Sequence, residues 1–87
     1  MATVHIPAPM RALTGGEAEV VASGRTLGEL ADTLEAAHPG LRDRLVEGAR
    51  IRPGVAVFVN GVNVPPALAT RIPEDAEIYF SPAIAGG

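Results

Sequence analysis

The chain has 87 residues, 47% of them hydrophobic and 20% charged, with a formal net charge of −3. This composition is typical of one globular domain and excludes an intrinsically disordered chain. The acidic balance and the 3% aromatic content argue against a nucleic-acid partner, and no apolar run is long enough to cross a bilayer. Without cysteine, disulfides and thiolate metal sites are excluded. The N-terminus lacks the basic segment and apolar stretch of a signal peptide, so we expect a cytoplasmic protein.

Two strands are predicted near the N-terminus. Residues 3–6 form the first, which ends at Pro7 because proline cannot continue a strand ladder. The Gly15-Gly16 pair marks a loop, and residues 17–22 return as a second strand, antiparallel to the first.

The clearest local signal is a helix over residues 27–37. Thr26 is followed three residues later by Glu29, which is the spacing of a capping box. Apolar side chains then recur at helical spacing, at Leu27, Leu30, Ala31, Leu34 and Ala37. His38-Pro39-Gly40 ends this helix.

The second half of the chain reads mainly as strands. Residues 41–46 are compatible with a short helical turn, and residues 51–54 read as a loop. The apolar run over residues 55–59 is the strongest strand signal, and the Asn60-Gly61 pair predicts a hairpin that brings residues 62–64 back beside it.

The last predicted strand covers residues 77–80 and is broken by Ser81-Pro82. The element order is therefore β-β-α-β-β-β, in which one helix must cover one face of one sheet. We expect an α+β fold of the β-grasp (ubiquitin-like) type, with a mixed sheet of four to five strands. Residues 1–82 form this domain, and residues 83–87 form a flexible C-terminal tail.

The tail ends in Gly86-Gly87, two residues without Cβ atoms. Such an end can enter a narrow channel, because glycine adds no bulk and tolerates unusual backbone angles. Five residues beyond Pro82 reach roughly 17 Å when extended, which would carry the Gly87 carboxylate into another protein's active site. The alternative to a functional tail is an ordinary disordered chain terminus.

The conjunction of this fold order with the ending Pro82-Ala83-Ile84-Ala85-Gly86-Gly87 resembles the MoaD/ThiS family of ubiquitin-like sulfur carriers. The similarity covers essentially the whole chain. It is closest to the CysO-type carriers of actinobacteria, through the segment Ala22-Ser23-Gly24-Arg25-Thr26-Leu27-Gly28 and the terminal motif.

The resemblance implies that an E1-like enzyme adenylates the Gly87 carboxylate with ATP and Mg²⁺, and that a sulfur donor converts the adenylate to a thiocarboxylate. A client synthase then takes the sulfur, and a metal-dependent peptidase that releases product from the tail is a further implied partner. The chain itself would be a carrier without catalytic residues, bound cofactor or metal. Gly86, Ala85 and Ile84 would be recognised with Gly87 in the partner's channel.

The resemblance also implies a docking patch on the sheet face opposite the helix. The candidates are Phe58, Val57, Val59 and Ser81, although a run that is apolar on both faces does not reveal which of its side chains point outward. Ser81 departs from the apolar or aromatic residue that is frequent there in relatives.

Other polar residues have ordinary structural interpretations. His38 lies where it helps a helix dipole, and His5 has no spacing that suggests a metal site. The pairs Asp32/Glu35 and Glu74-Asp75 read as a solvated helix face and a turn, and Arg50 and Arg52 as a solvated loop that could meet an acidic partner.

Three rival functions remain open at this stage. The chain could be the small subunit of a molybdopterin-synthase-like complex, a protein modifier that forms isopeptide bonds, or an interaction module with an inert tail. The client is not readable from the sequence: cysteine, molybdopterin, thiamine or a sulfur-containing secondary metabolite would all fit.

Overall fold

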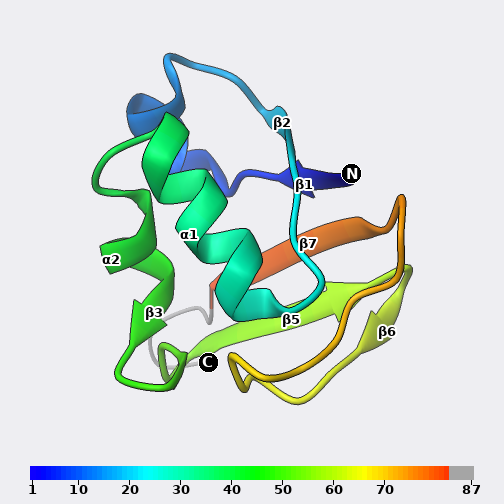
Figure 1. Ribbon diagram of the computed structural model, residues 1–87. Helices are drawn as coiled ribbons and strands as arrows, with labels where there is room; N and C mark the ends of the chain where they lie inside the picture. Colours follow the sequence, from blue (N-terminus) through cyan, green and yellow to red (C-terminus); the bar gives the residue numbers. More distant parts are fainter. Residues whose placement is uncertain (83–87) are drawn as a thin grey trace.

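The fold was analysed in a computed structural model that describes residues 1–82 (Figure 1). Its elements in chain order are β1 (Ala2–His5), the 3-10 helix η1 (Ala8–Thr14), β2 (Glu19–Ala22), α1 (Leu27–Ala37), α2 (Leu41–Leu45), β3 (Val46–Glu47), β4 (Arg50–Ile51), β5 (Val55–Val59), β6 (Val62–Asn63) and β7 (Glu77–Pro82). These elements confirm the predicted order of strands around one main helix.

The main sheet has five strands in the order β2-β1-β7-β5-β6. β1 and β2 form an antiparallel hairpin, and β5 and β6 form another. β7 lies between them, parallel to β1 and antiparallel to β5. The last strand of the fold is therefore the central strand of the sheet, and α1 crosses one face of that sheet (Figure 1). This is the β-grasp architecture.

α1 forms where the capping box predicts it. The Thr26 hydroxyl accepts a hydrogen bond from the Glu29 amide at 3.1 Å, and the Glu29 carboxylate accepts one from the Arg25 amide at 3.0 Å. The first bond satisfies a backbone donor that the helix itself leaves unpaired, and the second ties the residue before the N-cap to the first turn. Of the predicted apolar face, Leu27, Leu30, Ala31 and Leu34 are buried against the sheet.

The core lies between α1 and the sheet face that it covers. Val4, Val57 and Ile78 come from three neighbouring strands and are each 0% exposed. Leu41 and Leu45 of α2 extend the core at the side of α1.

The first two strands are shifted from their predicted bounds, since they cover Ala2–His5 and Glu19–Ala22 rather than 3–6 and 17–22. Two other predicted boundaries were wrong. β7 does not end at Phe80, because Ser81 and Pro82 still pair with Ala56 and Val55 of β5. Proline is tolerated at this place because its fixed φ suits extended backbone and the strand ends there.

The second wrong boundary is the predicted loop over residues 51–54, since Ile51 belongs to β4. This strand pairs with β3 in a separate two-stranded sheet. Ladders of two residues are too short to show the alternation by which strands are recognised. The helix η1 was not predicted at all.

Candidate functional site

The end of β7 is where the chain leads into the predicted tail. Pro82 lies opposite Val55, whose amide donates to the Arg52 carbonyl oxygen at 3.1 Å. The predicted sulfur-carrying and recognition residues lie outside the described residues, as does the predicted flexible tail as a whole: Ile84, Ala85, Gly86 and Gly87. What the structure does describe is the surface that surrounds the start of this segment.

The sheet has one face packed on α1 and one that points away from it, which we call the open face. One row of register partners crosses the open face over all five strands: Glu19, His5, Tyr79, Phe58 and Asn63. Beside it lie Val21, Thr3 and Glu77 on one side, and Ser81 with Ala56 on the other. The predicted docking residues Phe58 and Ser81 therefore belong to this face.

Val57 and Val59 do not belong to the open face, and their prediction as docking residues is corrected. Their exposed fractions are 0% and 6%, because their side chains alternate with Phe58 and point into the core beneath α1. A partner cannot reach them without opening the domain. The alternation of inward and outward side chains along β5 could not be seen in the sequence. The inward residues are valines and the outward ones are alanine and phenylalanine, so every position is apolar.

The centre of the open face holds a cluster that sequence reasoning missed. The rings of His5 and Tyr79 are stacked, with centroids 3.9 Å apart and planes within 2° of parallel. His5 Nε2 lies 2.7 Å from a Glu77 carboxylate oxygen, and Nδ1 lies 3.7 Å from one of Glu19. The pairing of β1 with β7 brings His5 to Tyr79 and Glu77, and the pairing of β1 with β2 brings it to Glu19. The spacing of these residues along the chain therefore gives no signal.

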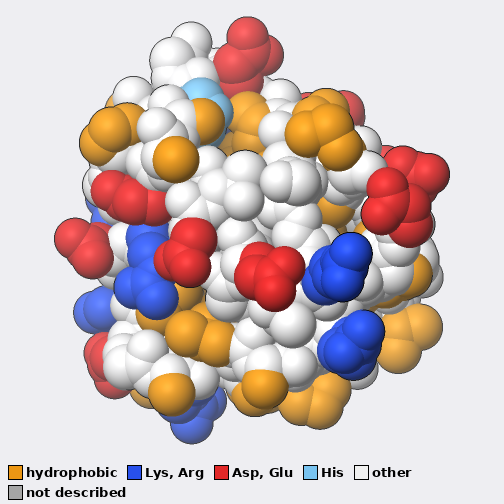
Figure 2. Space-filling view, viewed as in Figure 1, with side chains coloured by type: hydrophobic (Ala, Val, Ile, Leu, Met, Phe, Trp, Pro, Cys, Tyr) orange, Lys and Arg blue, Asp and Glu red, His pale blue; other side chains and the backbone are white. Residues whose placement is uncertain are grey.

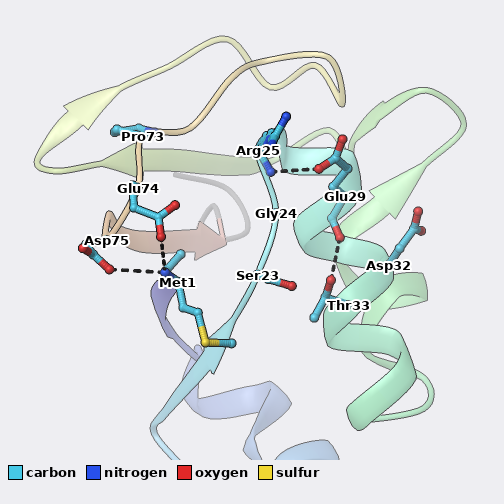
Figure 3. Close-up of a pocket in the computed structure, with 11 residues that line it drawn as sticks. Met1, Ser23, Gly24, Arg25, Glu29, Asp32, Thr33, Pro73, Glu74 and Asp75 are labelled. Atoms are coloured by element: carbon cyan, nitrogen blue, oxygen red, sulfur yellow. Dashed lines mark hydrogen bonds and ion pairs between the residues drawn. The ribbon is translucent and has the colours of Figure 1, made fainter.

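A cleft of about 460 Å³ lies at the opposite end of β7 (Figure 3). The N-terminal amine of Met1 donates there to Glu74 at 3.0 Å and to Asp75 at 3.2 Å. These hydrogen bonds raise the pKa of the amine above its ordinary value of 8.0. β7 runs away from this cleft, so the cleft and Pro82 lie at opposite ends of that strand. The cleft is lined by the two N-terminal residues, by residues of two turns, and by Glu29, Asp32 and Thr33 of α1.

The remaining candidates from the sequence have structural roles. The His38 amide donates to the Leu34 carbonyl oxygen at 2.7 Å and closes the end of α1. Asp32 pairs with Arg42 at 2.9 Å, and Arg52 pairs with Glu47 at 3.6 Å. Within residues 1–82, no group of three His, Asp or Glu side chains is placed to hold a metal ion. No helix in that range is long and apolar enough to span a membrane.

Glu35 fixes the turn between α1 and α2, and this predicts a dependence of stability on pH. Its carboxylate accepts hydrogen bonds from the amides of Gly40 and Arg42, which lower its pKa from the ordinary 4.5. A group whose pKa is lowered by folding stabilises the fold above its unfolded pKa, and this contribution is lost as the pH falls through the folded value. We therefore expect the stability difference between the wild type and Glu35→Gln to be constant at neutral pH and to shrink below pH 4.5. Urea unfolding of both proteins between neutral pH and pH 3 measures this; a difference that does not change with pH would contradict it.

Comparison with known proteins places these features in a family. The model of the ThiS family matches residues 4–87, nearly the whole chain. The chain belongs to the ThiS family. A relative named sulfur carrier protein CysO, from Mycobacterium tuberculosis, is 38% identical, and the alignment covers 98% of this chain and 97% of the relative. Small archaeal modifier protein 3 of Haloferax volcanii is 34% identical over 71% of this chain and 70% of its own length.

Solved structures agree with the family match. A structure described as the Amycolatopsis orientalis BexX/CysO complex contains a chain that superposes with a TM-score of 0.91 at 35% identity, covering all of both chains. CysO of M. tuberculosis gives 0.87 at 34% identity, over 97% of this chain and 100% of the other. The CysO relatives found by sequence are named sulfur carrier proteins rather than enzymes, and the solved structures share the β-grasp fold of this chain.

Proposed function

We propose that this member of the ThiS family is a sulfur carrier that is adenylated and then thiocarboxylated at Gly87. The observation that carries the proposal is the full-length similarity to CysO sulfur carriers, at 38% identity, in a chain whose last residues are Ala85-Gly86-Gly87. The family match also extends through residue 87. The chain offers no catalytic machinery of its own in this scheme, and the chemistry belongs to its partners.

The proposed steps follow from carboxylate chemistry. A carboxylate resists nucleophiles, so one of its oxygens first attacks the α-phosphate of ATP, which releases pyrophosphate and forms an acyl adenylate. Hydrosulfide, HS⁻, then attacks the acyl carbon and displaces AMP, and loss of the proton that remains on sulfur leaves a thiocarboxylate at Gly87. ATP and Mg²⁺ are held by an E1-like activating enzyme. The resulting sulfur is a soft anionic nucleophile that can react with an electrophilic substrate.

The partners in this proposal are the activating enzyme, a client synthase and a peptidase that frees the product. The match to a CysO found in complex with BexX supports a partner of the carrier, while the client metabolite is left open. The proposed setting is the cytoplasm, where ATP is available.

The second candidate is a protein modifier, which the similarity to a small archaeal modifier protein favours. In that case the activated Gly87 would acylate lysine amines of other proteins. The chain has no lysine, so chains linked through its own side-chain amines cannot form.

Intact-protein mass spectrometry separates the two candidates. The purified chain is incubated with the activating enzyme of its host, ATP, Mg²⁺ and a sulfide source. A sulfur carrier gains the mass of one oxygen replaced by sulfur at Gly87, and a sulfonyl azide probe then captures it. Stable linkage of Gly87 to lysines of many host proteins would instead support the modifier. Unchanged Gly87 with every candidate activating enzyme would contradict both.

A further inference from the structure

The two edges of the main sheet differ in how well they are protected from pairing with another strand. The edge strand β6 has only two residues, and Pro65 and Pro66, which have no amide proton, follow it after one residue. Short edge strands and prolines both keep an edge from pairing with another chain. The other edge strand, β2, has four residues and contains no proline. We call β2 the unprotected edge.

Every second residue of β2 has its backbone groups directed away from β1. The Ile6 amide donates to the Ala18 carbonyl oxygen at 2.8 Å, just beyond the end of the ladder between the two strands. Because hydrogen-bonded pairs alternate with non-bonded pairs in an antiparallel ladder, Val20 bonds to β1, whereas Glu19 and Val21 do not. Among residues 1–82, neither Glu19 nor Val21 has another backbone partner. The Val21 side chain is also 62% exposed, so this edge presents both polar backbone groups and apolar surface.

The segment around β2 is acidic at its start and basic at its end. Glu17 and Glu19 lie at the start, Arg25 follows the end, and all three are exposed. In the part of the chain that the structure describes, neither Glu17 nor Arg25 takes part in an ion pair. A second copy of β2 that runs antiparallel to the first brings the acidic start of each copy to the basic end of the other. Opposite charges across paired strands stabilise the pairing.

We propose that two copies of this chain pair antiparallel along their unprotected edges, with Val21 of one copy opposite Val21 of the other. The outward backbone groups of both strands then bond to each other around a twofold axis. In this register Glu19 lies opposite Ser23 of the second copy, and Glu17 comes beside Arg25 when the register is continued past the strand ends. No like charges face each other. This inference goes beyond the proposed carrier function and does not depend on it.

The twofold pairing closes on itself, so it produces a dimer rather than a fibre. Each copy uses its unprotected edge, and the edges that remain are the two β6 strands. On the helix-bearing side, acidic and basic side chains are interspersed, so two copies side by side do not meet with surfaces of one sign (Figure 2). β7 is two strands away from β2 and stays uncovered. An interface of one short strand pair is small, so the dimer forms only at high protein concentration.

Analytical ultracentrifugation of the purified chain tests the dimer directly. Between about 0.01 mM and about 1 mM, the range of weak complexes, the weight-average mass should rise from that of one chain toward that of two. A mass that stays at one chain over this range overturns the proposal. If such a monomeric chain is still adenylated by its activating enzyme, the carrier function stands and only the dimer is refuted.

A pair of matched substitutions locates the interface. Val21→Lys places two lysines directly opposite each other at the twofold axis and should raise the Kd of self-association by about tenfold or more. The control is Val62→Lys, the same change at a valine that is also 62% exposed but lies on β6, and it should change the Kd by less than about twofold. Circular dichroism verifies that both variants are folded. Equal effects of the two substitutions overturn the assignment to β2.

The register is tested by exchanging charges. Glu17→Arg and Arg25→Glu should each raise the Kd by about threefold or more, because each dimer loses two opposite-charge contacts. The double variant, in which the two charges are exchanged, should return to within about twofold of the wild type. These effects should shrink between about 0.1 M and about 0.5 M salt. A double variant that is weaker than both single variants overturns the antiparallel register.

Hydrogen exchange of the wild type gives a measurement that needs no variant. The amides of Glu19 and Val21 should exchange more slowly as the protein concentration rises, because they become hydrogen-bonded only in the dimer. The control is the amide of Asn63 on β6: since the Val64 amide donates to the Val57 carbonyl oxygen, that of Asn63 points outward from the other edge. Its exchange should not depend on concentration. Slowing at Asn63 instead of at Val21 would overturn the proposal.

Discussion

Removal of Gly86-Gly87 should abolish formation of the acyl adenylate and leave the stability of the domain nearly unchanged. The proposed reacting carboxylate is lost, and the new terminus would fall about 7 Å short of the position that Gly87 reaches in an extended tail. The core is built within residues 2–80, so the deletion removes no core side chain. Pyrophosphate release with the activating enzyme measures adenylation, and thermal unfolding measures stability.

The matched control for this deletion is Gly86→Ala/Gly87→Ala, which keeps both the length of the tail and its terminal carboxylate. Two added methyl groups should slow adenylation if the tail enters a narrow channel, without removing the reacting group. Adenylate formation by the truncated protein at the wild-type rate would show that Gly87 is not the site.

Leu30→Ala should destabilise the domain by about 2–5 kcal/mol, the range for removing most of a leucine side chain from a packed core. Leu30 is 0% exposed and lies in the buried stripe of α1. The truncated side chain leaves a cavity between helix and sheet, because the surrounding side chains relax only partly into the space. Urea unfolding followed by circular dichroism measures the change in the free energy of unfolding.

The control for this substitution is Val62→Ala, which removes apolar atoms from a side chain that is 62% exposed. Surface substitutions of this kind usually stay within about 0.5 kcal/mol. Since folded Leu30→Ala keeps the tail and the open face, it should still be adenylated at temperatures where it remains folded. A loss below about 1 kcal/mol would show that α1 packs less tightly on the sheet than its burial indicates.

The parts of the fold that the sequence predicted well are those with local signals. The capping box at Thr26 and Glu29 fixed the start of α1, and the Asn60-Gly61 pair fixed the hairpin between β5 and β6. The short ladder of β3 and β4 has no such signal, because two paired residues show no periodicity. The helix η1 was missed because prolines stand at its N-cap and in its first turn, and proline is as common in loops as at the start of a helix.

The candidate site was predictable only where it lies in the tail. Gly87 can be recognised in the sequence because two terminal glycines after a β-grasp order of elements are characteristic of the sulfur-carrier family. Its role as the sulfur-carrying residue stays a prediction. The docking face depends instead on register. Whether Val57 or Phe58 points outward is decided by how β5 pairs with β7, and the stacking of His5 on Tyr79 is decided by the pairing of β1 with β7. Pairings between strands that are far apart in the chain cannot be read from the local pattern of a single sequence.

The position of β7 between β1 and β5 also determines how the domain responds to mechanical load. β1 and β7 are parallel neighbours, so a force applied between Met1 and Pro82 pulls the two strands along their length in opposite directions. Their hydrogen bonds, and those from β7 to β5, then share the load and must break together rather than one after another. An enzyme that pulls on the chain beyond Pro82 is thus pulling on a strand anchored from both sides. We expect such traction to be transmitted to the whole domain as a rigid body instead of peeling its last strand away.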